Sequence, residues 1–290
     1  GDSLQAVQLA HHVNAVHDTD LPVQAVFETP SIRAMAQALT NSRSGDGKRL
    51  VKLVSGSDDV IVMWPGLGGY PLNLRELAQK ISQGRTVYGM QAPGLNLGEV
   101  FPDSLKSMAE ADLKILESLS DSDSMAFIGY SFGARIAAEV AGLYRARNGV
   151  DPMLILLAPG SPVVEGAPDR TGSPEWNDPY FCAVLESVFL GRLSKSPFIT
   201  ARHGGEFANY ITEKNPSMPY DLVMRIVQLV HATFDMRREN ADHLGRVLQH
   251  SFVLDSAGDG WSFVDDSAVS GMDRSITLDA DHYEILREPS

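Results

Sequence analysis

Residues 124–134 read SMAFIGYSFGA, and this stretch decides the predicted fold. An apolar run over 125–130 predicts a buried strand, and the residues that follow have the spacing of a helix. Between them GYSFG, residues 129–133, matches the pattern G-x-S-x-G at a strand-to-helix turn. Glycines flank the serine because a sharp turn brings backbone atoms close together. The stretch therefore predicts that Ser131 is a nucleophile at the end of a strand.

Strand-like and helix-like segments alternate on both sides of this turn. Such alternation predicts a mostly parallel sheet covered by helices on both faces, an α/β architecture. A helical insertion at about 161–246 interrupts it, and an insertion of that length predicts a lid over a binding site. The expected strands lie in LVKLVS, VIVMWPG, TVYGMQAPG, SMAFIGY, MLILLAPG, QHSFVLDS and the start of ITLDADHYEIL, and the expected helices in LNLRELAQKIS, SLKSMAEADLKILESL and GARIAAEVAGLYRARNG.

A second glycine-rich turn, WPGLGGY at 64–70, closes the strand VIVM. We expect an oxyanion hole between the two turns. The backbone N–H of Gly66 or Leu67, paired with that of Phe132, would hold the oxygen of a tetrahedral intermediate. A phosphate-binding loop is disfavoured because no Gly-Lys-Ser or Gly-Lys-Thr follows.

Eight histidines compete for the role of general base. His282 in LDADHYEIL lies at the end of a late predicted strand, which suits the chain order serine, aspartate, histidine. We therefore expect His282 to take the proton of Ser131. The other seven lie in the N-terminal helical segment or in the insertion and its edge: His11, His12, His17, His203, His231, His243 and His250.

The acid of the predicted triad has to come from one of two strand ends. After MLILLAPG the expected position holds Ala158, which cannot accept a hydrogen bond from an imidazole. The next strand ends in FVLDSAGDGW and offers Asp255 and Asp259. Asp259 is favoured because it follows the strand end in a turn, whereas Asp255 lies about where the strand stops. We expect Asp259 to orient His282 and to stabilise its protonated form.

Residues 1–41 have a helical pattern, and the polar stretch that ends at 50 predicts a linker over 42–50. The chain opens with GDSL, which leaves two roles for Ser3: nucleophile of a GDSL-type hydrolase, or attachment point of a prosthetic arm. The D-x-x-H pattern that ends at His282 suits the first role. However, GDSL opens a helical segment here and no G-x-N-D block follows. The second role is favoured, because the N–H groups and dipole of a helix N-terminus stabilise a phosphodiester.

Composition excludes several classes of protein. The 290 residues carry a formal net charge of −13 without a run of cations, so neither nucleic acid nor an anionic membrane is expected as a partner. A single cysteine, Cys182, excludes an internal disulfide and suits a reducing, cytoplasmic compartment. We expect no membrane span, no export signal and no metal site. The chain starts inside a motif, so we expect its natural N-terminus to lie upstream.

The N-terminal segment resembles a carrier domain. GDSLQAVQLAHHVN and LPVQAVFETPSIRAMAQAL are similar to the last three helices of peptidyl or acyl carrier proteins. The resemblance implies that Ser3 bears covalent 4′-phosphopantetheine, whose thiol holds an acyl group as a thioester. It also implies that residues 1–41 are a partial carrier, because the family's first helix lies outside this chain.

Residues 51–290 resemble the type I thioesterase domains that end non-ribosomal peptide synthetases, which have the α/β-hydrolase fold. The resemblance rests on WPGLGGY, VYGMQAPGLN, GYSFGARIAAEVA and DADHYEIL, and Ala158 departs from it because many members carry the acid there. It implies that a peptidyl or acyl chain passes from the carrier arm to Ser131 and leaves by hydrolysis or intramolecular cyclisation. Upstream synthetase modules are then partners. Two alternatives stay open: an editing, type II-like acyl-thioester hydrolase and a non-catalytic module that docks carriers.

Overall fold

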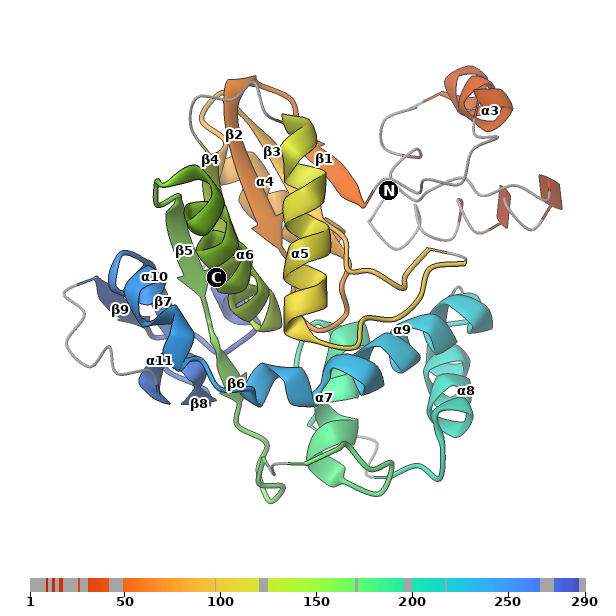
Figure 1. The fold of residues 1–290 in the computed structure, drawn as a ribbon. Helices are drawn as coiled ribbons and strands as arrows, with labels where there is room; N and C mark the ends of the chain where they lie inside the picture. The colour runs from red at the N-terminus through yellow and green to blue at the C-terminus, as the bar shows by residue number, and fades with distance from the viewer. Residues whose placement is uncertain are drawn as a thin grey trace.

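The structure, a computed structural model, describes residues 31–41, 49–96, 98–119, 125–169, 172–195, 200–216, 218–266 and 274–286, with single positions at 9, 12, 13, 16, 17 and 26. A seven-stranded sheet with the order β1-β3-β2-β4-β5-β7-β9 forms its centre (Figure 1). β1 is antiparallel to β3, and every other neighbouring pair in this sheet is parallel. The mostly parallel α/β sheet that the sequence predicts is therefore confirmed.

The central strands are buried on both faces, as their continuous apolar sequences predict. Residues 60–64 of β2 and 127–130 of β4 are all buried. A separate antiparallel ribbon of two short strands, β6 and β8, follows β5 and β7 in the chain. The strand bounds are β1 (Leu50–Val54), β2 (Ser57–Trp64), β3 (Arg85–Met90), β4 (Met125–Tyr130), β5 (Met153–Leu157), β6 (Gly160–Pro162), β7 (Phe252–Ser256), β8 (Asp259–Ser262) and β9 (Ser275–Leu278).

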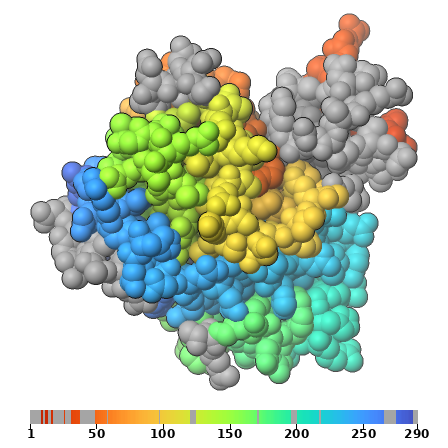
Figure 2. All heavy atoms as spheres, in the orientation of Figure 1, coloured from red at the N-terminus to blue at the C-terminus, as the bar shows by residue number. Residues whose placement is uncertain are grey.

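Helices cover the sheet on both faces. α5 (Leu105–Leu116) and α6 (Phe132–Asn148) lie side by side on the near face, yellow and green in Figures 1 and 2. α4 (Arg75–Ile81), preceded by η1 (Pro71–Leu74), packs against β1 on the far side in Figure 1. α6 ends where Gly149 adopts a left-handed φ of 75°, a backbone conformation that terminates helices.

Three helices of the insertion gather at one end of the sheet (Figure 1). They are α7 (Pro179–Leu190), α8 (Gly204–Lys214) and α9 (Tyr220–Thr233). α8 packs against α9, and Figure 2 shows α9 in blue along the lower edge of α5 and α6. The stretch at about 161–246 that the sequence assigns to a lid contains all three. Its first residues, however, belong to β6, and η4 near its end packs on α6.

Short elements complete the described chain. In the N-terminal segment, α3 (Ile32–Asn41) lies within the stretch 1–41 that has a helical pattern in the sequence. Ser3 lies outside the described residues. The remaining elements are η2 (Glu117–Leu119), η3 (Asp235–Arg238), η4 (Asp242–Leu244), α10 (Gly245–Gln249), α11 (Phe263–Asp266) and η5 (Glu284–Leu286).

A buried ion pair ties α5 to the sheet. The Asp112 carboxylate accepts a hydrogen bond from the Arg49 guanidinium just before β1, and another from Trp64 Nε1 at the end of β2, at 2.9 Å. All three side chains are buried. Removing the carboxylate would leave the Arg49 charge buried without its partner, which costs far more than the loss of a surface pair.

We predict that Asp112→Ala lowers the free energy of unfolding by about 3–5 kcal/mol, the usual result of breaking a buried ion pair from one side. The measurement is urea denaturation. Glu110→Ala on the same helix is the control, because its pair with Lys106 is exposed and 3.9 Å long, and we expect it to cost less than about 0.5 kcal/mol. Equal stability of both variants would contradict the prediction.

Candidate active site

Ser131 lies on a strained turn between β4 and α6. Its φ of 55° and ψ of −125° are outside the regions that residues with side chains ordinarily adopt. A Cβ at Gly133 would lie 2.3 Å from the carbonyl oxygens of Trp64 and Pro65, and one at Gly129 would lie 2.4 Å from the Gly133 oxygen. Neither position admits a side chain, so the two glycines of the motif allow β4, α6 and the end of β2 to meet.

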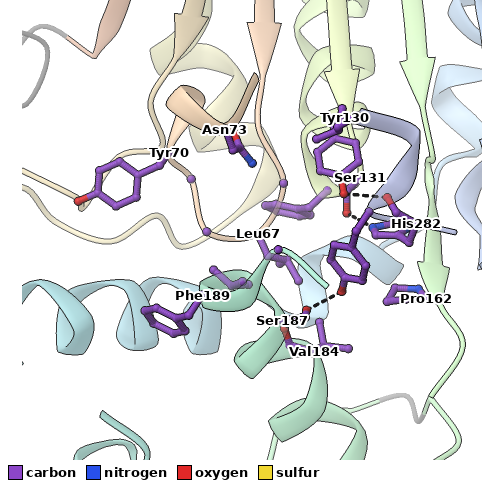
Figure 3. A pocket seen from close by; sticks show the side chains of 18 of the residues that line it. Leu67, Tyr70, Asn73, Tyr130, Ser131, Pro162, Val184, Ser187, Phe189 and His282 are labelled. Atoms are coloured by element: carbon purple, nitrogen blue, oxygen red, sulfur yellow. Dashed lines mark hydrogen bonds between the residues drawn. The ribbon is translucent and has the colours of Figure 1, made fainter. Parts of the chain in front are cut away.

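The structure brings together the three residues that the sequence predicts as a triad. His282 Nε2 lies 2.8 Å from Ser131 Oγ (Figure 3), and His282 Nδ1 lies 2.8 and 2.9 Å from the two Asp259 carboxylate oxygens. With the Nδ1 proton donated to Asp259, Nε2 of a neutral His282 is the acceptor for the Ser131 proton. The His282 and Asp259 side chains are 4% and 7% exposed, so little water competes for these hydrogen bonds.

The backbone of His282 is itself held in place. Tyr130, the residue before the serine, donates from its hydroxyl to the His282 carbonyl oxygen at 2.8 Å. On the other side, Asp281 Oδ1 accepts from the backbone N–H groups of Tyr283 and Glu284, both at 2.8 Å. The sequence pattern alone predicts no role for Tyr130, although its position inside G-x-S-x-G places it next to the nucleophile.

His12 and His17 are exposed in the N-terminal segment, and His11 lies outside the described residues. Four more histidines contact structural partners away from Ser131. Their hydrogen bonds and ring contacts explain their positions without a role in proton transfer. His203 Nδ1 accepts from the Glu206 N–H at 3.2 Å, His231 stacks on Trp176 at 4.8 Å, His243 Nε2 lies 2.9 Å from Glu139, and His250 Nδ1 donates to the Arg246 oxygen at 2.9 Å.

Asp259 is positioned by the ribbon rather than by a turn. The sequence places it in a loop after a strand, but it is the first residue of β8 and pairs with Pro162 of β6. Gly160 leaves room for it, because a Cβ there would lie 2.9 Å from Asp259 Cβ and 3.1 Å from Oδ2. Asp255, the other candidate, lies within β7 and accepts a hydrogen bond from Ser275 Oγ at 3.2 Å.

Ala158 directly follows the end of β5 and has a left-handed conformation. Its φ is 43°, its side chain is buried, and its N–H donates to the Leu254 oxygen at 2.8 Å. A methyl group accepts no hydrogen bond, so an acid for His282 has to come from another strand. The next strand of the sheet, β7, leads directly into the ribbon that carries Asp259.

The expected oxyanion donors surround Ser131. A Cβ at Gly66 would lie 3.4 Å from Ser131 Cβ and 3.6 Å from its Oγ, which places the Gly66 backbone beside the nucleophile. Leu67 lines the same cavity as Ser131. Phe132 is the first residue of α6, and the first N–H groups of a helix have no acceptor within it. The role of these groups in holding an oxyanion stays a prediction.

Ser131 and His282 open into a cavity of about 940 Å³. Figure 3 shows it between the end of β4, the 66–70 loop and the helices of the insertion. A cavity of this size takes a ligand as large as a drug molecule. Much of its wall is apolar, formed by side chains that include Leu72, Val184, Val188, Phe189, Leu222 and Ile226.

Metal binding and thiol chemistry have little support in the described residues. There, no group of three or more His, Cys, Asp or Glu side chains could hold a metal ion. Burial raises the pKa of Cys182 to about 11, so this thiol stays protonated and is a poor nucleophile. None of the helices in the described ranges is long and apolar enough to cross a membrane.

Comparison with protein-family models gives two matches. Residues 60–191 match the thioesterase domain family, and residues 1–39 match the phosphopantetheine attachment site family. The chain is also similar to two indigoidine synthases. It is 35% identical to that of Streptomyces lavendulae over 99% of the chain, and 32% identical to that of Dickeya dadantii over 100%. It spans only 23% and 20% of their lengths.

Solved structures share the fold at lower sequence identity. A holo four-domain nonribosomal peptide synthetase matches with a TM-score of 0.65 and 15% identity, over 97% of this chain and 22% of that one. A thioesterase domain bound to a dodecadepsipeptide matches with a TM-score of 0.53 and 20% identity, over 83% and 92%. A type II thioesterase of the yersiniabactin pathway matches with 0.55 and 18%, over 82% and 92%.

The contact between Gly160 and Asp259 gives a prediction. Gly160→Ala places a methyl group against the carboxylate and should shift it away from His282, and a displacement of about 1 Å can lower a rate by roughly 10²-fold. The measurement is the rate at which Ser131 reacts with a fluorophosphonate. Gly142→Ala on α6 is the control, because its Cβ would meet no side chain closer than 3.7 Å. A wild-type rate for Gly160→Ala would show that the site tolerates the methyl group.

Proposed function

Because this chain carries a thioesterase domain behind a phosphopantetheine attachment site, we propose that it is the chain-releasing end of a non-ribosomal peptide synthetase. Its domain is a serine hydrolase that acts on thioesters. In this proposal residues 1–41 are a partial carrier, 42–50 a linker and 51–290 the releasing domain, with the lid at about 161–246. One observation carries it: Asp259, His282 and Ser131 are hydrogen-bonded in series beside a large cavity.

4′-Phosphopantetheine belongs to the carrier segment, and when attached it supplies the acyl group as a thioester. We propose Ser3 as its attachment point. The domain has room for the acyl group, because the cavity beside Ser131 measures about 940 Å³ and has a largely apolar wall. The partners follow from this: an acyl or peptidyl thioester on the carrier arm, and the synthetase modules that build it.

Acyl transfer begins at Ser131. Its Oγ attacks the thioester carbonyl carbon while His282 Nε2 accepts the hydroxyl proton. The N–H groups of Phe132 and of Gly66 or Leu67 stabilise the oxygen of the tetrahedral intermediate. The carbon–sulfur bond then breaks, His282 returns the proton to the sulfur, and the acyl group remains as an ester on Ser131. Asp259 holds the His282 ring and stabilises its charge throughout.

Release repeats the same steps with a different nucleophile. A water molecule, or an amine or hydroxyl of the acyl chain itself, gives its proton to His282 and attacks the ester carbonyl. The Ser131 oxygen leaves and recovers its proton from His282. Water yields a free acid, whereas an internal nucleophile yields a ring. The cavity decides between the two outcomes by admitting water or by folding the chain back on itself.

A second candidate function is editing, the removal of stalled acyl groups from carriers. The observation that favours it is that the acid follows β7, whereas position 158, where many type I thioesterase domains carry the acid, holds an alanine. The carrier segment favours the release function, because it brings a thioester to the domain within one chain. The two functions share the same chemistry at Ser131 and differ in the acyl groups that they accept.

We predict that Ser131→Ala abolishes the release of acid or ring from synthetic acyl-pantetheine thioesters, because removal of the nucleophile of such a triad lowers the rate by about 10⁴-fold or more. Products are identified by mass spectrometry over a series of acyl lengths, and unchanged thermal unfolding serves as the control. Release by Ser131→Ala together with its loss in Ser3→Ala would reverse the roles of the two serines.

The second prediction separates the two candidate acids. Asp259→Asn should lower the rate of acyl transfer to Ser131 by about 10⁴-fold, as the same change does in comparable triads, because the His282 ring loses its orientation and charge stabilisation. Asp255→Asn is the matched control and should keep the wild-type rate. A normal rate for Asp259→Asn with a slow Asp255→Asn would move the acid to β7. Normal rates for both would leave a serine–histidine dyad.

A further inference from the structure

Two consecutive residues of the insertion contact both of the loops that flank Ser131. They are Ser187 and Val188 on α7, and both line the cavity beside the nucleophile. Ser187 is hydrogen-bonded to the residue that follows His282, and Val188 contacts the glycine-rich turn at 66–69. Covering a substrate requires neither contact, so each calls for an explanation of its own.

Ser187 is fixed by two hydrogen bonds. Its Oγ donates to the Val184 carbonyl oxygen on the same helix, and it is also paired with the Tyr283 hydroxyl, the bond drawn at Ser187 in Figure 3. A serine hydroxyl has one proton, so Tyr283 is the donor in the second bond. Burial raises the pKa of Tyr283 well above its usual range, so its hydroxyl keeps the proton that it donates. Ser187 itself is 1% exposed, which leaves little room for water to replace the tyrosine.

The ring of Tyr283 packs on the imidazole of the general base. Its centroid lies 5.1 Å from that of His282 at an interplanar angle of 74°, the edge-to-face arrangement that aromatic pairs favour. The Tyr130 ring makes a second contact with the imidazole at 5.6 Å. Tyr283 cannot turn away from His282 without breaking its hydrogen bond to Ser187. The hydroxyl and the ring of Tyr283 therefore connect α7 to the imidazole.

Val188 lies against the turn that carries an expected oxyanion donor. A Cβ at Gly68 would lie 2.6 Å from Val188 Cγ1, so the valine methyl group fills the space in front of the glycine. Within the same turn, the Gly69 N–H donates to the Gly66 oxygen at 2.9 Å, and Gly66 lies beside Ser131. Val188 thus contacts the middle of a tight turn whose first residue adjoins the nucleophile.

We propose that α7 is a positioning element for the reaction at Ser131, in which Ser187 holds Tyr283 against His282 and Val188 holds the 66–69 turn beside the nucleophile. The proposal rests on the proposed function, because acyl transfer is the reaction that needs the base and the oxyanion donors in place. Neither residue exchanges a proton with the substrate. Because the two contacts come from consecutive residues, a displacement of α7 disturbs the base and the turn together.

Tyr283→Phe tests the first contact, because it keeps the ring beside His282 and removes only the hydroxyl. A misplacement of about 1 Å can cost roughly 10²-fold in rate, and we expect a loss of about tenfold in kcat because Asp259 still holds the imidazole. KM should change by less than about twofold, since the groups that bind the acyl chain remain. Both constants are measured with hexanoyl- and octanoyl-pantetheine. The rate at which a fluorophosphonate labels Ser131 should fall by a similar factor. Wild-type kcat and labelling, or a change confined to KM, would overturn the proposal.

Ser187→Ala removes the same hydrogen bond from the other side. If the two residues act through that bond, the variant with both changes is no slower than the slower of the two single variants. Losses that multiply in the double variant would mean that Ser187 and Tyr283 act separately, which contradicts the proposal.

Tyr210→Phe is the matched control. The Tyr210 hydroxyl donates to Glu186, the residue before Ser187, but it does so from α8. We expect this variant to keep the wild-type kcat even where its Tm is lower. Equal losses of kcat in Tyr210→Phe and Tyr283→Phe would show that α7 acts only through stability, against the proposal. A wild type that is labelled by the fluorophosphonate but releases no acid or ring would instead overturn the proposed function, and labelling would still test the positioning.

A pair of substitutions tests the second contact. Gly68→Ala drives a methyl group into Val188 and should slow labelling of Ser131 by about tenfold or more. Val188→Ala removes the methyl group that the new Cβ meets and leaves Val188 Cβ 3.9 Å away, an ordinary contact. The combination Gly68→Ala with Val188→Ala should therefore recover to within about threefold of the wild-type rate, faster than either single variant. A wild-type rate for Gly68→Ala, or no recovery in the combination, would overturn the role of Val188.

Discussion

The backbone of Ser131 is the constraint on which the rest of the site depends. A residue held at φ 55° costs about 1–3 kcal/mol, and surrounding packing has to maintain it. Here β4, β2 and the start of α6 meet so closely that Gly129 and Gly133 have no room for a Cβ. The same closeness directs the N-terminus of α6 toward the serine and sets Gly66 beside its hydroxyl. The same close packing therefore positions both the nucleophile and the candidate oxyanion donors.

The two partners of Ser131 follow β7 and β9, the last two strands in the order of the sheet. His282 follows β9, the last strand in the order, and its carbonyl accepts the Tyr130 hydroxyl across 152 residues of chain. Asp259 reaches the imidazole from the β6–β8 ribbon. The two strands of this ribbon follow β5 and β7, which are neighbours in the main sheet. Ala158 at the end of β5 and Gly160 in β6 belong to one arrangement: the first lacks a carboxylate, and the second leaves space for the carboxylate of Asp259.

The cavity beside the triad has a largely apolar wall. The apolar side chains of this wall come largely from the insertion. They set the shape of the cavity but offer no hydrogen bonds to a ligand.

The sequence by itself determined the parallel sheet, the turn at Ser131 and the position of His282. These features are written in local patterns: apolar runs, glycine spacing and the order of strands. It also favoured Asp259 over Asp255, but it expected a turn where β8 begins. Only the tertiary structure decided what surrounds these residues: the ribbon that carries Asp259, the space at Gly160 and the anchor from Tyr130. These contacts join residues that lie far apart in the chain, and their geometry depends on how strands and helices pack in three dimensions, which no local pattern records.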